Sequence, residues 1–227
     1  MKKIVLLLLC ALIALPTCAW AANDIEVQQE ALYYQHYVIY CDVSGYWEVQ
    51  NTGETPLFVY AATLDLFDTA DESLLSDPMY AMYPSILQPG ETGYIVKNAY
   101  VDNVADVETI ARHALTMNAQ AAEREVTHLK VIKAEIRDSV LPGSPLERAF
   151  YVTVESEAEG VLYGSQVVVG AYDADGKLLF VNFAIPYETG LLMGSQVEIC
   201  ITLNPATVEM VGGLDKIAEI RAMAYME

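Results

Sequence analysis

The feature that most constrains the fold is an alternation of apolar and polar residues over residues 37–51. Apolar side chains stand at every second position, at Tyr37, Ile39, Cys41, Val43, Trp47 and Val49. Successive side chains of a β-strand point to opposite faces, so this pattern is typical of an antiparallel strand with one buried face. The segment is long for a single strand, and Ser44-Gly45 is the expected site of a bulge or bend.

Three features of this region recur about a hundred residues later in the same order. An acidic turn at residues 68–72 matches Asp-Ala-Asp-Gly at residues 173–176, and each follows a strand-like segment and precedes a return strand. The tetrapeptide Ala-Glu-Ile-Arg stands at residues 134–137 and again at residues 218–221. This order and spacing indicate an internal repeat.

The repeat predicts two tandem antiparallel β-sandwich modules, residues 22–140 and residues 146–227. Residues 141–145, Leu-Pro-Gly-Ser-Pro, have the composition of a linker between them. Within the first module an alanine-rich stretch carries apolar residues at helical spacing, and Asp106 is suited to cap a helix. We therefore expect one helix over about residues 106–124, inserted in the first module.

Three motifs of the first module carry a family resemblance: GYWEVQNTGETP at residues 45–56, LFD at residues 66–68 and LQPGE at residues 87–91. Together they resemble the FxLYD-type domain, an immunoglobulin-like sandwich of exported proteins in Gram-positive bacteria. The second module keeps YDADGK at residues 172–177 but lacks the other two turns. The resemblance implies two immunoglobulin-like modules and an exported location, and it implies no activity.

Residues 1–21 have the plan of a bacterial secretory signal peptide. Two lysines precede an apolar run from Ile4 to Leu15, and Ala19-Trp20-Ala21 supplies small residues before a cleavage site. The apolar run is shorter than the roughly 20 residues that a membrane span needs. We expect a secreted, extracellular protein with no transmembrane segment in the mature chain. The alternative is a lipoprotein anchored through Cys18.

The charge of the chain excludes one class of partner. Asp and Glu number 31 against 12 Lys and Arg, which gives a net charge of −19. Such a surface repels nucleic-acid phosphates, so we expect no nucleic-acid partner. Cys41 and Cys200 stand one in each module, which rules out a disulfide within a module. Whether they are free or bridge the modules stays open.

Motifs of the common catalytic and cofactor sites are missing. The sequence has no Gly-x-Ser-x-Gly elbow and no glycine-rich phosphate loop, and its 3 histidines lack metal-ligand spacing. Asp173 and Asp175 resemble the opening of a calcium loop, but the twelfth position holds Ala184 instead of glutamate. We expect no enzymatic activity, no cofactor and no metal, with Asp173 and Asp175 as weak calcium candidates.

The 15 tyrosines suggest where a ligand would bind. Exposed tyrosines stack on sugar rings or anchor protein partners, although tyrosine also favours strands for packing reasons alone. Tyr80, Met82 and Tyr83 gather in the segment Ser76–Ser85 and form the predicted ligand site. We expect a non-enzymatic exported binding or spacer protein of the bacterial cell envelope, with an unknown protein or glycan partner at the cell surface. The alternative is an extracellular carbohydrate- or peptidoglycan-associated protein.

Overall fold

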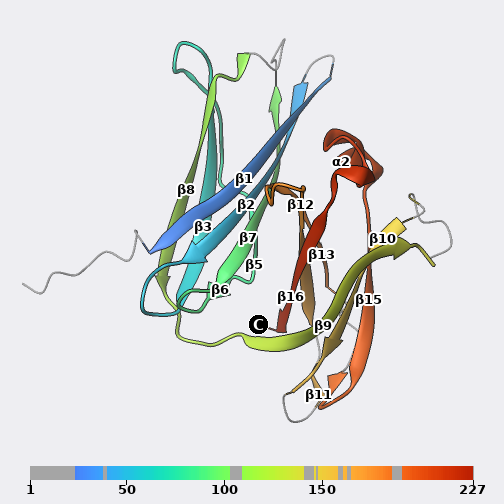
Figure 1. Cartoon of the computed structure of the whole chain (residues 1–227). Helices are drawn as coiled ribbons and strands as arrows, with labels where there is room; N and C mark the ends of the chain where they lie inside the picture. The colour runs from blue at the N-terminus through green and yellow to red at the C-terminus, as the bar shows by residue number, and fades with distance from the viewer. Residues whose placement is uncertain are drawn as a thin grey trace, which may run out of the picture.

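The computed structural model describes residues 24–37, 40–102, 109–140, 146, 148–157, 161–162, 165–185 and 191–226. In this part of the chain the protein is mainly β, with antiparallel sheets (Figure 1). No helix within it is long and apolar enough to cross a membrane. The predicted signal peptide with Cys18 and the predicted linker at residues 141–145 lie outside the described residues.

Two sheets face each other in the N-terminal part of the chain. Sheet A has the order β1-β2-β7-β5, which are Ile25–His36, Tyr40–Asn51, Thr92–Asp102 and Ala81–Tyr83. Sheet B contains β3 (Leu57–Phe67), β4 (Ser73–Asp77), β6 (Ile86–Leu87) and β8 (Arg112–Ala121). β8 pairs along one edge of β3, while β4 and β6 share the other edge, because Leu57 pairs with both Leu87 and Ala121.

The core of this sandwich follows the predicted alternation. Cys41, Val43, Trp47 and Val49 of β2 are at most 1% exposed and pack against β3. The structure has no bulge at Ser44-Gly45, since β2 pairs with β7 there without a shift and the register shift lies in β1 between Val27 and Gln29. Gly45 instead makes room for the indole: a Cβ atom there would come within 2.3 Å of the Trp47 ring.

The helix predicted over residues 106–124 is also wrong. β8 is a strand that pairs along β3 from Ala121, opposite Leu57, to Arg112, opposite Phe67. Leu115, Met117 and Ala119 pack toward the core at the two-residue spacing of a strand. Alanine favours helices, but packing of a half-buried strand against its neighbour overrides this weak preference. Asp106, the predicted cap, lies outside the described residues.

Sheet C has six strands in the order β13-β12-β16-β9-β10-β15. These are Leu178–Ala184, Gln166–Tyr172, Glu219–Met226, Thr127–Asp138, Arg148–Glu155 and Gln196–Thr202. The sheet curves until its end strands approach each other, and Asn182 Nδ2 on β13 donates to Thr202 O on β15 at 2.9 Å. Apolar side chains fill its interior, with Phe150 and Phe180 stacked at 6.0 Å.

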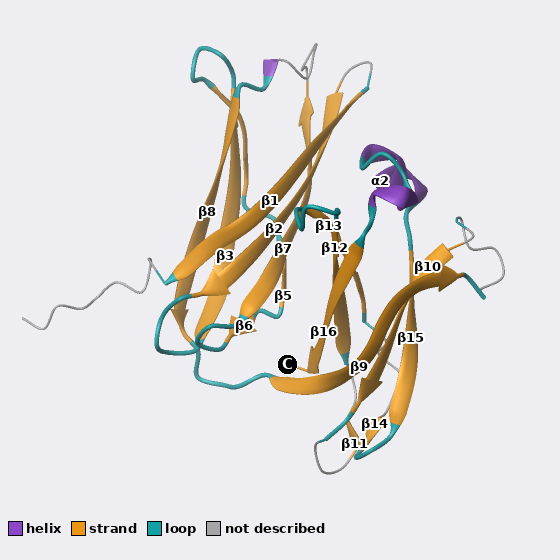
Figure 2. Ribbon diagram, in the orientation of Figure 1, coloured by secondary structure: helices purple, strands orange, loops and turns teal. Residues whose placement is uncertain are grey.

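Short elements complete the C-terminal part (Figure 2). β11 (Val161–Leu162) pairs with β14 (Leu191–Leu192). Between β15 and β16 the chain forms α2 (Pro205–Met210) and a 3-10 helix, η3 (Leu214–Lys216). The side chain of Asn204 caps α2 by accepting a hydrogen bond from Ala206 N at 2.9 Å.

β9 belongs to sheet C, although we expected residues 22–140 to form one module. It lies between β16 and β10, so the chain crosses from sheet B to sheet C at residues 122–126, before the predicted linker. The repeated tetrapeptide therefore marks neighbouring strands of one sheet. Arg137 stacks on Tyr151 at 3.8 Å and Arg221 stacks on Tyr172 at 4.0 Å, each hydrogen-bonded to the glutamate two residues earlier.

Part of sheet A is covered on both faces, which makes three layers of sheet there. Its inner face packs on sheet B, and its outer face carries Tyr46, Tyr94 and Val96 into the core of sheet C. Tyr46 contacts Phe180 edge to face, with 6.4 Å between the ring centroids. The two parts of the chain are therefore joined by a packed interface.

Candidate functional site

The three residues predicted to bind a ligand lie together, but they pack against the protein. Tyr80 is partly buried and donates its hydroxyl to Val59 O at 2.9 Å. Met82 and Tyr83 belong to β5 and are each 8% exposed. Tyr83 stacks on Phe183 of β13 with 4.4 Å between the ring centroids. The structure therefore gives all three a packing role, and ligand binding by them stays a prediction.

The two weak calcium candidates lie in a hairpin turn that occurs twice in the chain. Asp173 Oδ1 accepts hydrogen bonds from the backbone N–H groups of Asp175 and Lys177, both at 2.9 Å. Asp68 Oδ1 does the same for Ala70 and Glu72, both at 2.8 Å. These bonds explain the aspartates without a metal, because a side chain that caps its own turn stabilises it. No cluster of potential metal ligands occurs in the part of the chain that the structure describes.

Cys41 and Cys200 are both free in this structure. Cys41 is fully buried on the inner face of β2, as predicted, and Cys200 on β15 is partly buried. Burial raises the pKa of the Cys41 thiol, and the nearby Asp42 raises it further. Such a thiol is not activated for nucleophilic chemistry.

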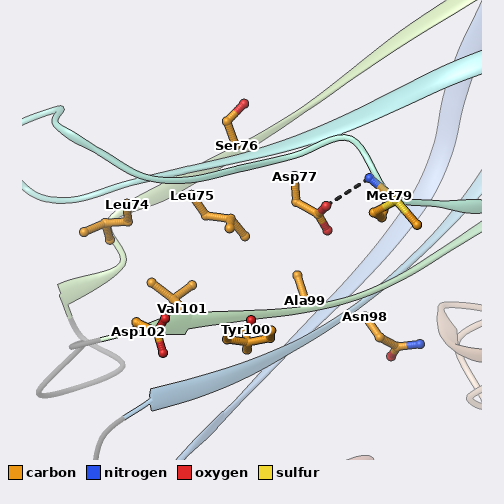
Figure 3. A pocket seen from close by; sticks show the side chains of 10 residues that line it. All are labelled: Leu74, Leu75, Ser76, Asp77, Met79, Asn98, Ala99, Tyr100, Val101 and Asp102. Atoms are coloured by element: carbon orange, nitrogen blue, oxygen red, sulfur yellow. Dashed lines mark hydrogen bonds between the residues drawn. The ribbon is translucent and has the colours of Figure 1, made fainter.

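A groove of about 490 Å³ opens between sheets A and B on one side of the sandwich (Figure 3). Residues 74–77 and Met79 form one wall, and residues 98–102 of β7 form the other. In Figure 3 the side chains of Leu75, Ala99 and Val101 point into the space between the two strands. The floor of the groove is therefore apolar.

The groove exists because strand pairing stops on this side. β5 pairs with β7 only through the residues opposite Tyr94, Ile95 and Val96. Beyond Val96 no described strand pairs with this edge of β7, nor with the outer edge of β4. A strand edge without a partner presents a row of backbone donors and acceptors, which is a template for pairing with another extended chain.

Lys97 precedes the groove-lining residues 98–102 on β7. Its side chain is fully buried, and Nζ donates to the carbonyl oxygens of Asp77 at 2.7 Å, Ala62 at 3.3 Å and Met79. The Asp77 carboxylate lies 3.6 Å away. All three ammonium donors are thus used. Burial lowers the pKa of Lys97, while Asp77 opposes the shift. The lysine ties β7 of sheet A to β3 and β4 of sheet B beside the groove.

The rim of the groove is exposed, aromatic and acidic. Met79 and Tyr100 are 72% and 63% exposed, and they flank the opening from opposite walls. Asp102 lies at one end and is exposed, and Asp42 stands beside Tyr100 on the neighbouring strand. No lysine or arginine lines the groove itself. Exposed apolar side chains around an apolar floor are a common feature of interaction sites.

A buried hydrogen-bonded network joins sheet A to sheet C. The hydroxyl of Tyr172 lies 2.8 Å from the hydroxyl of Tyr94 and donates to Glu48 Oε2 at 2.8 Å. Glu48 is 9% exposed and Tyr94 is 2% exposed. Burial raises the pKa of Tyr94 to about 12. Gly170 makes the approach possible, since a Cβ atom there would lie 2.6 Å from Tyr94 Oη.

A second hollow, of about 410 Å³, lies where β1 meets β13. Residues 30–34 and residues 177–179 line it, together with His113 and Asp173. Glu30 Oε2 accepts a hydrogen bond from Trp47 Nε1 at 3.2 Å and lies 3.2 Å from His113 Nε2. Two tyrosines beside carboxylates provide stacking surfaces and hydrogen-bond acceptors, which is chemistry suited to a sugar.

Sequence reasoning missed Lys97 and Glu48, for different reasons. Lys97 interrupts the apolar series Ile95, Ala99 and Val101 on one face of a strand, and that interruption was a readable signal. Glu48 stands on a face that we expected to contact water. Only the packing of sheet C on this face makes it a buried group, and the sequence carries no sign of that packing.

Comparison with known proteins adds no identity. No protein family matches the chain, and no curated protein matches it. The resemblance to FxLYD-type domains therefore stays a prediction.

Proposed function

We propose that the chain is a non-enzymatic exported binding protein of the bacterial cell envelope, built from two immunoglobulin-like modules. The observation that carries the proposal is the groove between β4 and β7, which combines an apolar floor with two strand edges unpaired in the described chain. Trp47, fully buried between sheets A and B, is typical of the core of such a sandwich. The network around Tyr172 supports the spacer aspect, because it couples the two parts rigidly.

Binding is tested with the mature chain, Ala22–Glu227. Its melting temperature is measured with panels of peptides, oligosaccharides and peptidoglycan fragments, because a ligand that binds only the folded state raises it by mass action. A dose-dependent rise with any one class supports a binding protein. The proposal is overturned in favour of an enzyme if no compound raises the melting temperature while the protein cleaves a peptide, oligosaccharide or peptidoglycan fragment into soluble products.

Export is tested separately. Residues 1–21 are fused to a reporter enzyme that is active only outside the bacterial cytoplasm. Reporter activity is compared between this fusion and the same fusion carrying Leu8→Asp, which places a charge in the apolar run. Reporter activity of the parent fusion, lost in the Leu8 variant, supports export. Labelling of full-length protein with a lipid precursor, abolished by Cys18→Ala, would establish the lipoprotein alternative. Lack of reporter activity contradicts export.

The second candidate is a carbohydrate- or peptidoglycan-associated protein, favoured by the hollow beside β1. Tyr34 and Glu30 line it, and neither is fully buried. Loss of a glycan-induced rise in melting temperature in Tyr34→Ala, but not in the control Tyr60→Ala on β3, would place the sugar in this hollow. An equal loss in both variants would contradict it.

A further inference from the structure

We propose that the groove between β4 and β7 binds an extended peptide segment of a partner protein, in which apolar residues alternate with lysine or arginine. The segment adds as a strand to the edge of β7. This inference rests on the proposed binding function and names the class of partner.

The backbone carries the first part of the argument. Residues 98–102 pair with β2 on one side, and no described strand pairs with their other side. Peptides that add to a sheet edge gain affinity from main-chain hydrogen bonds and specificity from alternate side chains. Five residues at about 3.3 Å each span about 17 Å, which is enough to pair with a short extended segment. No proline lies within residues 98–102 of β7, so this strand edge keeps all its backbone N–H groups, while Pro78 follows the last residue of β4 on the opposite wall.

The side chains of β7 explain why the bound segment must alternate. Ala99 and Val101 point into the groove, while Tyr100 and Asp102 lie on the opposite face of the strand. A strand added in register would place every second side chain over the apolar floor, where an apolar residue loses water-exposed surface. Its other side chains would lie on the face that carries Tyr100, Asp102 and, one strand further, Asp42.

Charge selects basic residues for that outer face. Asp102 is exposed, Asp42 is partly exposed, and the lone lysine nearby, Lys97, is buried and already paired with Asp77. The exposed tyrosine between the aspartates also attracts cations through its ring. A second copy of the chain is a poor occupant, because the net charge of −19 opposes self-association.

The test uses fluorescence anisotropy with the mature chain and three short labelled peptides. The first alternates valine and lysine, the second alternates valine and glutamate, and the third has the composition of the first with its valines and lysines in separate blocks. We expect the first alone to bind, and to bind more weakly at high salt. Equal binding of the first and third peptides refutes strand addition, since charge alone would then explain the affinity.

Variants locate the site. Ala99→Leu fills the floor of the groove and should weaken binding at least tenfold. Asp102→Lys should weaken it about fivefold, the effect of losing an exposed charge pair. Asp138→Lys on β9 is the matched charge control and should change binding less than twofold. Each variant is used only if its melting temperature matches the parent. Unchanged affinity in Ala99→Leu places the peptide elsewhere and overturns the proposal.

Hydrogen exchange separates pairing from adhesion. Addition of a strand should slow amide exchange within residues 98–102, whereas a peptide held by charge alone would leave it unchanged. Self-association in place of peptide binding, measured by sedimentation, would show that a second copy is the occupant and would refute the basic partner. If no peptide binds but a glycan raises the melting temperature, this inference fails while the proposed binding function stands.

Discussion

The variant Tyr172→Phe tests whether the buried network holds sheets A and C together. It removes one hydroxyl and keeps the aromatic ring, so the packing of Arg221 on that ring at 4.0 Å is preserved. The hydroxyl makes two contacts, with Tyr94 Oη and with Glu48 Oε2, each at 2.8 Å. Both partners are almost fully buried, so water cannot easily replace the lost bonds.

The magnitude follows from these contacts. A hydrogen bond to a charged group contributes about 1.5–3 kcal/mol, and a buried hydroxyl left without a partner costs about 1–3 kcal/mol. Some relaxation around the removed atom reduces the sum, so we expect Tyr172→Phe to lower the free energy of unfolding by about 3 kcal/mol. Tyr94→Phe should cost about 1 kcal/mol, because the bond from Tyr172 to Glu48 survives. Tyr60→Phe, an exposed control, should change stability by less than about 0.5 kcal/mol.

Urea unfolding of the mature chain measures these differences. Trp47 is the only tryptophan left after removal of residues 1–21, so its fluorescence reports on sheets A and B. Circular dichroism reports on all sheets, and a gap between the two transitions would show that the parts have uncoupled. A double-mutant cycle of Tyr172→Phe with Glu48→Gln should give a coupling energy of at least about 1 kcal/mol. A coupling energy near zero, or a loss below about 1 kcal/mol for Tyr172→Phe, would refute the reasoning.

Three further predictions concern the same interface and the groove. Gly170→Ala should destabilise the protein by about 1–3 kcal/mol in urea unfolding, because the new Cβ atom would lie 2.6 Å from Tyr94 Oη and push the tyrosine away. Combining Gly170→Ala with Tyr94→Ala removes the clash and should recover part of the lost stability. Lys97→Met should cost about 3 kcal/mol, since Asp77 and three carbonyl oxygens lose their partner, whereas a cost below about 1 kcal/mol would show that water replaces the ammonium. Folding raises the pKa of Tyr94 from its ordinary value of 10.0 to about 12, because the buried hydroxyl resists ionisation. The resulting contribution to folding stability is fully present below pH 10 and is lost as the pH rises toward about 12. Stability should therefore fall over this alkaline range, and an unchanged fall in Tyr94→Phe would contradict the assignment.

The sequence predicted the strands whose side chains alternate and whose turns have distinctive composition. β2 with Trp47 and the hairpin at Asp173 are examples, because period and turn chemistry are local properties. β8 was misread, since its alanines fit both periods and only pairing with β3 decides between them. A register shift near Val59 and Ala61 likewise changes which residues of β3 face the core.

The candidate site was less predictable than the fold. Tyr80, Met82 and Tyr83 drew attention as aromatic and apolar residues near turns, but residue type does not reveal burial. The groove depends on where β5 stops pairing with β7, and that point is set by contacts between segments far apart in the sequence. Lys97 was the one local signal, a charged residue on the inward face of an otherwise apolar strand.

The place of β9 in sheet C has a consequence for the order of folding. β9 begins sheet C in the sequence and β16 ends it, yet they are neighbours, with Thr127 opposite Met226. Until β16 has been synthesised, the edge of β9 at residues 127–129 lacks its partner. Sheet C can therefore be completed only once β16 has been made, and a premature stop before Glu219 would leave an open, aggregation-prone edge in the middle of the sheet.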